Sequence, residues 1–262
     1  MVKCNITGKG KVKMENNIII EIKNMSMEFK LAEEQSDSLK EQIIKSLQKK
    51  NSYSYLKALN SISLKVESGE VIGIVGSNGS GKSTLLRIIA GALRPTQGEV
   101  LVDKKKVQLL TLGTGFDPQL TAKENVYLNG ALIGYSKKYI DQNYEKIVDF
   151  AELQGFMNEK MKNFSSGMIS RLGFSIATVG DFKDILLLDE ILSVGDIAFR
   201  KKSGERINEL IHGGATVLMV SHSLEAIQTH CSRVIWIEKG ILKLDGNSKD
   251  VCKEYRNYMS NK

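Results

Sequence analysis

The sequence contains little cysteine and little proline. Its three cysteines, Cys4, Cys231 and Cys252, lie far apart and lack the spacing of metal ligands, which favours a reduced, cytoplasmic setting. Two prolines, Pro95 and Pro118, interrupt the 262 residues, and no internal repeat is present. The pattern is therefore not that of a disulfide-rich secreted domain.

Long apolar runs are also missing. No run approaches the roughly 20 residues of a membrane span, and the basic N-terminus lacks the apolar stretch of a signal peptide. We therefore expect a chain that is neither secreted nor membrane-spanning on its own. The 42% of hydrophobic residues can fill the core of one large domain, or of a domain with a subdomain. The net charge of +7 would suit contact with nucleic acid or with an anionic membrane surface. It is equally consistent with charged side chains that are simply exposed to solvent.

Short apolar runs separated by long helical segments indicate a mainly parallel sheet. An early strand is predicted at Ile18 to Ile22, and three compact runs predict buried strands: VIGIVG (71–76), DILLLDE (184–190) and TVLMVSH (216–222). The run VIWIEKGILKL (234–244) alternates around Lys239-Gly240, which predicts a β-hairpin.

The segment GSNGSGKST follows the first buried strand and precedes a helical run. It places Gly76, Gly81, Lys82 and Ser83 in the G-x-x-x-x-G-K-[ST] pattern of a phosphate-binding loop, or P-loop. The glycines let backbone N–H groups surround phosphates, Lys82 neutralises phosphate oxygens, and the Ser83 hydroxyl can bind Mg²⁺. A simple glycine turn would not require this combination between a strand and a helix.

Two further strands carry polar residues to their carboxyl ends, where open α/β sheets bind ligands. ILLLDE ends on Asp189 and Glu190, and TVLMVSH ends on His222. We predict that Asp189 holds Mg²⁺ through water, that Glu190 polarises the attacking water, and that His222 hydrogen-bonds a γ-phosphate. Without the P-loop, ordinary surface acids and a structural histidine would be the simpler interpretation.

The segment NFSSGMISRL (163–172) fits two roles. Ser165 or Ser166 can cap a helix that carries apolar side chains at Met168 and Leu172. The free amides and the positive dipole end of that same helix also suit an anion. The local sequence alone favours the cap.

Five motifs in this order, GSNGSGKST, FSSGM, ILLLDE, SVGD and VSH, resemble those of an ABC-type nucleotide-binding domain from Ile18 to about Tyr258. The resemblance implies an α/β P-loop NTPase of the ABC type, with a mainly parallel sheet core, an antiparallel β subdomain and a helical signature subdomain. It implies an ATPase that uses ATP and Mg²⁺ and forms a homodimer around the nucleotide. In such a dimer Ser165, Ser166 and Gly167 cap the γ-phosphate of ATP held by the other subunit.

The resemblance also implies residue roles. Catalysis would fall to Glu190, His222 and Lys82, and the metal to Ser83 and Asp189. Asp196 of SVGD and the whole P-loop would contact the nucleotide, the loop residues being Gly76, Ser77, Asn78, Gly79, Ser80, Gly81, Lys82, Ser83 and Thr84. The expected organisation is a flexible extension at 1–17 and a nucleotide-binding domain at 18–258, whose helical subdomain covers about 120–180.

Longer sequence segments extend the resemblance to one subfamily of ABC-type ATPases. PTQGEV, LGTGFDPQLTAKENVYLNG, DEILSVGDIAFRKK and CSRVIWIEKG are similar to ATPase subunits of teichoic-acid and O-antigen type exporters. This implies a peripheral protein on the cytoplasmic face of the cell membrane that binds integral-membrane permease subunits and the inner membrane surface, and no nucleic acid. Some relatives carry an additional C-terminal domain, which we do not expect here.

The sequence departs from the general ABC pattern at the expected glutamine between P-loop and signature. Counting back from LTAKENV places the expected glutamine near Leu112 and Gly113. Gln108 and Gln119 lie several residues away, so no glutamine is assigned. Phe164 and Met168 replace the usual leucine and glutamine of the signature, as in the exporter subfamily. Phe29 fits best as the residue that stacks on adenine; Tyr53, Tyr55 and a purely structural aromatic are the alternatives.

An inserted amphipathic helix is predicted at about 31–52. Its apolar stripe consists of Leu39, Ile43, Ile44 and Leu47. Either the domain itself covers this stripe, or it docks near the permease with Lys45, Lys49 and Lys50 facing anionic headgroups. Among rival functions, a P-loop kinase would not need FSSGM or VSH. A soluble ABC-type ATPase acting in assembly or repair is the stronger alternative to an exporter.

Overall fold

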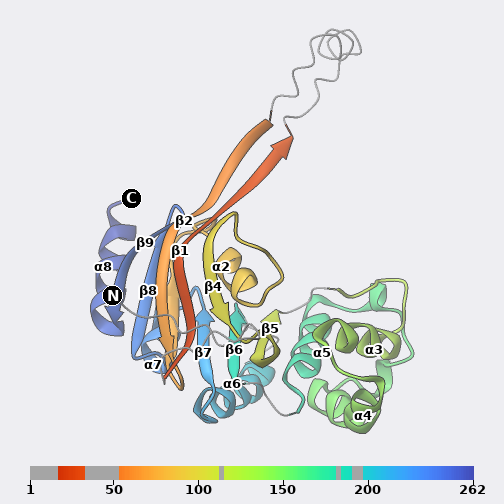
Figure 1. Cartoon of the computed structure of the whole chain (residues 1–262). Coiled ribbons are helices and arrows are strands. Elements are labelled where there is room, and N and C mark those ends of the chain that lie inside the picture. Colours follow the sequence, from red (N-terminus) through yellow and green to blue (C-terminus); the bar gives the residue numbers. More distant parts are fainter. Residues whose placement is uncertain (1–16, 33–52, 112–114, 181–183, 191–196) are drawn as a thin grey trace, which may run out of the picture.

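A computed structural model describes residues 17–32, 53–111, 115–180, 184–190 and 197–262 of the chain (Figure 1). Its strands are β1 (Ile18–Ala32), β2 (Tyr53–Glu67), β3 (Val71–Val75), β4 (Gln97–Val102), β5 (Val107–Thr111), β6 (Ile185–Asp189), β7 (Thr216–Val220), β8 (Arg233–Glu238) and β9 (Ile241–Asn247). Its α-helices are α2 (Lys82–Ile89), α3 (Ala122–Ile133), α4 (Lys137–Ala151), α5 (Ser166–Thr178), α6 (Ile197–His212), α7 (Leu224–His230) and α8 (Ser248–Ser260). Single 3₁₀ turns cover Lys104–Lys106, Gln154–Phe156 and Met161–Asn163.

The central sheet has six strands in the order β5-β6-β7-β3-β8-β9. The first five run parallel, and β9 joins the edge antiparallel to β8 through a turn at Lys239-Gly240. The predicted mainly parallel core and the predicted hairpin are confirmed. Because β3, β7 and β6 are neighbours, the motifs that follow them in the sequence meet at one edge of the sheet.

Alternate residues of the buried strands face opposite layers. In β6, Ile185 and Leu187 join a core beneath the antiparallel sheet and α2, whereas Leu186 and Leu188 join a second core beneath α6 and α5. Both faces of β6 are thus covered, which explains why its sequence is a continuous apolar run without alternation. Cys231 and Cys252 are free thiols packed in the second core.

The smaller sheet is antiparallel, in the order β2-β1-β4. The strands β1 and β2 pair along their whole length, from Ile18 opposite Glu67 to Ala32 opposite Tyr53, and their far ends project beyond the body as a two-stranded ribbon (Figure 1). The predicted strand at Ile18 to Ile22 is the first third of β1. Leu31 and Ala32 continue this strand, so an insertion would begin after them; the rest of the predicted helix at 31–52 lies outside the described residues.

The helices α3, α4 and α5 form a separate layer beside β5 (Figure 1). They enclose a third apolar core, to which Ile140, Ile147, Leu172 and Ile176 contribute. A capping box between Thr121 and Glu124 starts α3. This is the helical subdomain that the fold class predicts. No helix in the described ranges is both long enough and apolar enough to cross a bilayer.

Candidate nucleotide-binding site

The P-loop connects β3 to α2 and leaves the first amides of that helix open. Gly81 stands at the N-cap with φ of 107° and gives no side-chain cap to α2. Gly79 also has positive φ, at 73°. Uncapped N–H groups at a helix N-terminus, beside a loop in left-handed conformations, form a cradle for an anion. The backbone after β3 thus has the open N–H groups that a phosphate-binding loop requires, and phosphate binding there stays a prediction.

Neighbouring backbone explains why glycine is needed at the two ends of this loop. A Cβ on Gly76 would lie 1.9 Å from the carbonyl oxygen of Ile237 in β8. A Cβ on Gly81 would lie 2.7 Å from the carbonyl oxygen of Ala58 in β2. The loop is therefore enclosed between the central sheet and the base of the β1–β2 ribbon.

Lys82 bends back over the loop. Its side chain is buried, and its Nζ donates to the carbonyl oxygens of Gly76 at 2.8 Å and Ser77 at 2.9 Å. Burial lowers the pKa of Lys82, an effect opposed by the nearby carboxylates of Glu190 and Asp189. The amine is held within the loop, where phosphate oxygens can replace the carbonyls as its partners.

Ser83 and Asp189 meet across the site. The Ser83 hydroxyl donates to Asp189 Oδ1 at 3.2 Å, joining the start of α2 to the end of β6. A hydroxyl and a carboxylate are hard oxygen ligands of the kind that Mg²⁺ accepts, together with water and phosphate oxygens. The described part of the chain holds no cluster of three or more His, Cys, Asp or Glu that could bind a metal by itself. These two residues therefore fit an ion that is also held by the substrate.

Glu190 and His222 face each other at the next strand ends. Glu190 Oε1 lies 2.8 Å from His222 Nε2, and about half of each side chain is exposed. Glu190 adopts φ of 58°, which non-glycine residues seldom do, and its N–H donates to the carbonyl of Val220 at 3.1 Å. A strained backbone that aims a carboxylate out of a sheet edge is typical of functional sites.

The serines of FSSGM cap a helix, as the local sequence favours. Ser165 is the N-cap of α5, and its hydroxyl accepts from the N–H of Met168 at 3.2 Å. Ser165 and Ser166 are exposed, and Gly167 is partly so. In the described ranges no hydrogen bond or ion pair joins these residues to the P-loop. One copy of the chain thus presents the P-loop and the signature as separate surfaces.

The comparisons with known proteins decide the family. Residues 59–193 match the model of the protein family that is described as "ABC transporter". The chain belongs to this family. It is an ABC-type ATPase that binds ATP.

Relatives resemble this ABC ATPase over most of its length. The O-antigen export system ATP-binding protein RfbB of Klebsiella pneumoniae is 37% identical over 247 residues, which are 92% of this chain and 99% of the relative. The teichoic acids export ATP-binding protein TagH of Listeria innocua is 38% identical over 246 residues, 94% of this chain and 72% of the relative. A solved dimeric bacterial ABC transporter cassette matches 88% of this chain and 99% of its own, with a TM-score of 0.65 and 24% identity, which confirms the fold.

Phe29 and Asp196 are also predicted to contact the nucleotide, with Tyr53 and Tyr55 as the alternatives to Phe29 for adenine stacking. Phe29 is partly buried against the core beneath the ribbon, opposite Leu56, while Tyr55 is 63% exposed. Adenine stacking by Phe29 stays a prediction. Asp196 and the side chain of Tyr53 lie outside the described residues.

The two glutamines near the expected position have other partners. The Gln108 side chain is buried in β5 and donates to the Tyr135 hydroxyl at 3.1 Å. Gln119 is exposed in the loop before α3, where its N–H donates to Asp117. Residues 112–114 lie outside the described ranges. In the described ranges no hydrogen bond joins either glutamine side chain to Ser83 or Asp189.

Sequence reasoning missed Glu238. This carboxylate, at the end of β8, accepts hydrogen bonds from the backbone N–H and the hydroxyl of Ser77 within the P-loop. The sequence shows only an acid before a Lys-Gly turn, which is typical of an exposed strand end, so no local signal identifies it. Ser77 was predicted to contact nucleotide, yet both of its donors are directed at Glu238.

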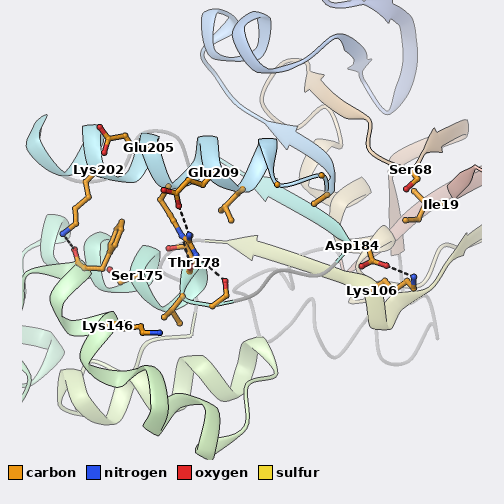
Figure 2. A pocket seen from close by; sticks show the side chains of 18 residues that line it. Ile19, Ser68, Lys106, Lys146, Ser175, Thr178, Asp184, Lys202, Glu205 and Glu209 are labelled. Atoms are coloured by element: carbon orange, nitrogen blue, oxygen red, sulfur yellow. Dashed lines mark hydrogen bonds and ion pairs between the residues drawn. The ribbon is translucent and has the colours of Figure 1, made fainter.

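A cavity of about 1030 Å³ lies away from the P-loop. Figure 2 shows that it extends between the helical subdomain and α6, with the Lys106–Asp184 ion pair at one end. These two residues precede β5 and β6, so this end of the cavity is at the amino ends of the strands. The P-loop is at the opposite edge. The cavity is therefore separate from the nucleotide site.

Proposed function

We propose that this ABC ATPase supplies the energy for export of a lipid-linked cell-surface polysaccharide or teichoic-acid-like polymer through a separate membrane permease. The observation that carries the proposal is the near-complete overlap with the O-antigen export ATP-binding protein, 99% of whose length aligns with this chain. The relatives named for teichoic acid export support the same substrate class. On this proposal the protein is a peripheral subunit at the cytoplasmic face of the cell membrane.

The site geometry supports the chemistry of ATP hydrolysis. Lys82 would exchange its two carbonyl partners for β- and γ-phosphate oxygens, which neutralises charge where it increases in the transition state. Glu190 would orient the attacking water and accept its proton, while His222 holds the Glu190 carboxylate and reaches the γ-phosphate.

The metal would be held by Ser83 and Asp189. Mg²⁺ bound there supplies charge neutralisation of the phosphates. The protein's own part is to bring the hydroxyl and the carboxylate within 3.2 Å of each other before substrate arrives.

A homodimer completes the site on this proposal. Ser165, Ser166 and Gly167 open the N-terminus of α5 toward solvent, apart from the P-loop of the same chain. A helix N-terminus of this kind suits a phosphate. The γ-phosphate held by one copy would therefore be capped by the signature of the other.

Depletion of the protein in its native cell tests the function. We expect a lipid-linked polymer to accumulate on the cytoplasmic side, and wild-type protein but not the Lys82→Ala variant to restore surface polymer. Affinity purification from solubilised membranes should recover an integral-membrane permease. Normal surface polymer after depletion, together with no membrane partner, would instead favour the soluble ATPase acting in assembly or repair.

A further inference from the structure

Glu238 is a buried carboxylate directly behind the P-loop. It is the last residue of β8, and 2% of its surface is exposed. A buried carboxylate is unfavourable unless hydrogen bonds and an opposite charge compensate it. Its partners are Ser77, Tyr258 and Lys262, and none of them is a predicted catalytic residue or metal ligand.

Ser77 is the closest of these partners. Its hydroxyl donates to Glu238 Oε1 at 2.8 Å and its backbone N–H to Oε2 at 3.2 Å. The carbonyl of the same residue accepts from Lys82 Nζ at 2.9 Å. A continuous line of hydrogen bonds thus runs from Glu238 through Ser77 to the amine that is predicted to bind phosphate. A shift of Ser77 would therefore displace Lys82.

The β8–β9 hairpin, which contains Glu238, contacts the loop at two more points. The N–H of Gly240 donates to the carbonyl of Ser80 at 2.9 Å. The carbonyl of Ile237 lies so close to Gly76 that no side chain fits there. The β8–β9 hairpin therefore fixes the P-loop at residues 76, 77 and 80, and Glu238 is the side chain that does so.

The charge of Glu238 is balanced by the end of the chain described here. Lys262 Nζ lies 3.2 Å from Glu238 Oε1, and the Tyr258 hydroxyl donates to the same oxygen at 3.4 Å. Trp236 packs against Tyr255 and Tyr258, which fixes α8 on β8. Burial by itself would raise the pKa of Glu238, but the hydrogen bonds from Ser77 and Lys262 outweigh it and the pKa lies below its ordinary value.

We propose that Glu238 is a positioning residue for ATP, which sets the P-loop through Ser77, and that Lys262 beyond α8 balances its charge and so links the C-terminal helix to nucleotide affinity. The inference rests on ATP binding at the P-loop, as in the proposed function. It assigns Ser77 to anchoring the loop rather than to phosphate contact.

The sign of the effect separates positioning from mere proximity. A carboxylate that only happened to lie behind the loop would repel the anionic nucleotide, so neutralising it would tighten ATP binding. A positioning carboxylate has the opposite consequence, because a misplaced loop loses several phosphate contacts at once. Removal of Lys262 leaves an unbalanced negative charge near the phosphates and weakens ATP binding in both cases, so the Lys262 variant tests the charge balance, and the Glu238 and Ser77 variants test the positioning.

The test measures the dissociation constant for ATP with Mg²⁺ by calorimetry, on the purified full chain. We expect Glu238→Gln to weaken binding by about five- to tenfold, as for the loss of a charge-assisted hydrogen bond, and to raise KM with little change in kcat. Ser77→Ala should act in the same direction. The effects of the two changes should be less than additive in the double variant, because both remove the hydrogen bond between the Ser77 hydroxyl and the Glu238 carboxylate.

Lys262→Met tests the role of the C-terminal helix, with the exposed Lys253→Met on the same helix as the control. We expect about threefold weaker ATP binding for Lys262→Met, by the like-charge argument, and no change for the control. Melting temperatures of all variants separate this from general destabilisation. A purely structural Glu238 would lower the melting temperature yet leave the affinity of the folded protein unchanged.

Several results would overturn the inference. Unchanged or tighter ATP binding by Glu238→Gln would do so, and so would additive effects in the double variant. If Glu238→Gln does not fold, unchanged affinity in both Ser77→Ala and Lys262→Met has the same meaning. Absence of ATP binding by the wild-type chain would instead contradict the proposed function, so the two failures are distinguishable.

Discussion

Glu190 and His222 are in direct contact although 31 residues lie between them in the sequence. The contact exists because β6 and β7 are parallel neighbours with Asp189 opposite Val220, so that residues just beyond these ends come together. The pair lies at the same edge as the Ser83–Asp189 contact. The proposed metal ligand Asp189 and the proposed general base Glu190 are therefore neighbours, and mutation can test their roles separately.

Lys82→Ala and Glu190→Gln should fail at different steps. Loss of the Lys82 amine should weaken ATP binding by about 10- to 100-fold, since a charged hydrogen-bonding partner of the phosphates is lost. Glu190→Gln should bind ATP normally and lower kcat by about 10²- to 10⁴-fold, as for loss of a general base. Calorimetry and phosphate release on both variants check this. Wild-type turnover by Glu190→Gln would show that another group activates the water.

Gly167→Asp should block the second half of the site while leaving nucleotide binding to one copy intact. The new carboxylate would face a γ-phosphate and repel it. Gly167→Ala is the matched control, because the nearest atom to a Cβ there is Ser165 Oγ at 3.8 Å, an ordinary contact. We expect ATP-driven dimer formation, followed by light scattering, to be lost in the first variant and kept in the second.

Mixtures of variants test whether the signature acts on the other subunit. In a mixed dimer of Gly167→Asp with Lys82→Ala, both defects fall on one of the two sites and the other site is intact. Such mixtures should therefore recover part of the ATPase activity that each homogeneous dimer lacks. Equal activity of mixed and homogeneous dimers would contradict action in trans.

Gly76→Ala should destabilise the fold much more than Gly69→Ala. Both positions have positive φ, 152° and 80°, but a Cβ at Gly69 has no atom within 4 Å, whereas at Gly76 it would collide with the Ile237 carbonyl. We expect about 1–2 kcal/mol from backbone strain at Gly69. At Gly76 the loss should exceed about 4 kcal/mol or prevent folding. Urea unfolding of the two variants measures the difference.

Tyr135 should steepen the loss of stability at high pH. Burial raises the pKa of Tyr135 to about 12, although the hydrogen bond from Gln108 opposes this. The folded state therefore keeps a proton that the unfolded state releases above about pH 10, and stability falls as pH rises from about 10 to about 12. Tyr135→Phe should flatten this part of the profile. Parallel profiles for the two proteins would contradict the assignment.

The insertion predicted between β1 and β2 offers a test of permease docking. The ribbon carries exposed apolar side chains near its far end, including Leu31, Tyr55 and Leu56. If the predicted stripe in 33–52 docks on the permease, Ile43→Asp with Leu47→Asp should leave basal ATP hydrolysis intact and abolish permease pull-down and export. If the domain covers the stripe, the same change should lower the melting temperature by several degrees. A strongly destabilised variant would therefore contradict docking.

Much of the fold could be predicted because its signals are local. The runs before Gly76, Asp189 and His222 are apolar on both faces, which marks buried parallel strands, and Lys239-Gly240 is a turn signal between alternating runs. The edge at which the three motifs meet follows from the strands being parallel. The meeting of Ser83 and Asp189 at one edge of the sheet could therefore be predicted from the sequence.

Other features depend on contacts that the sequence does not display. The strand β1 is three times as long as predicted, 15 residues instead of the five from Ile18 to Ile22, because its outer part is stabilised by pairing with β2 rather than by an apolar pattern of its own. Glu238 reads as a surface acid, since nothing near it in sequence shows that Ser77 and Lys262 surround it. Such roles arise from distant residues and become visible only in three dimensions.

The strand order also constrains when the nucleotide site forms during synthesis. The strand β3, which presents the P-loop, is complete by Val75, yet its two neighbours in the sheet are β7 and β8, which begin at Thr216 and Arg233. A nascent chain must therefore grow by about 160 residues, the separation of Ser77 from Glu238, before the loop gains its supports. Until β7 has been made β3 has two unpaired edges, and until β8 has been made it has one, and an unpaired edge is open to pairing with other chains. We therefore expect the P-loop to gain its full support only after β8 has left the ribosome.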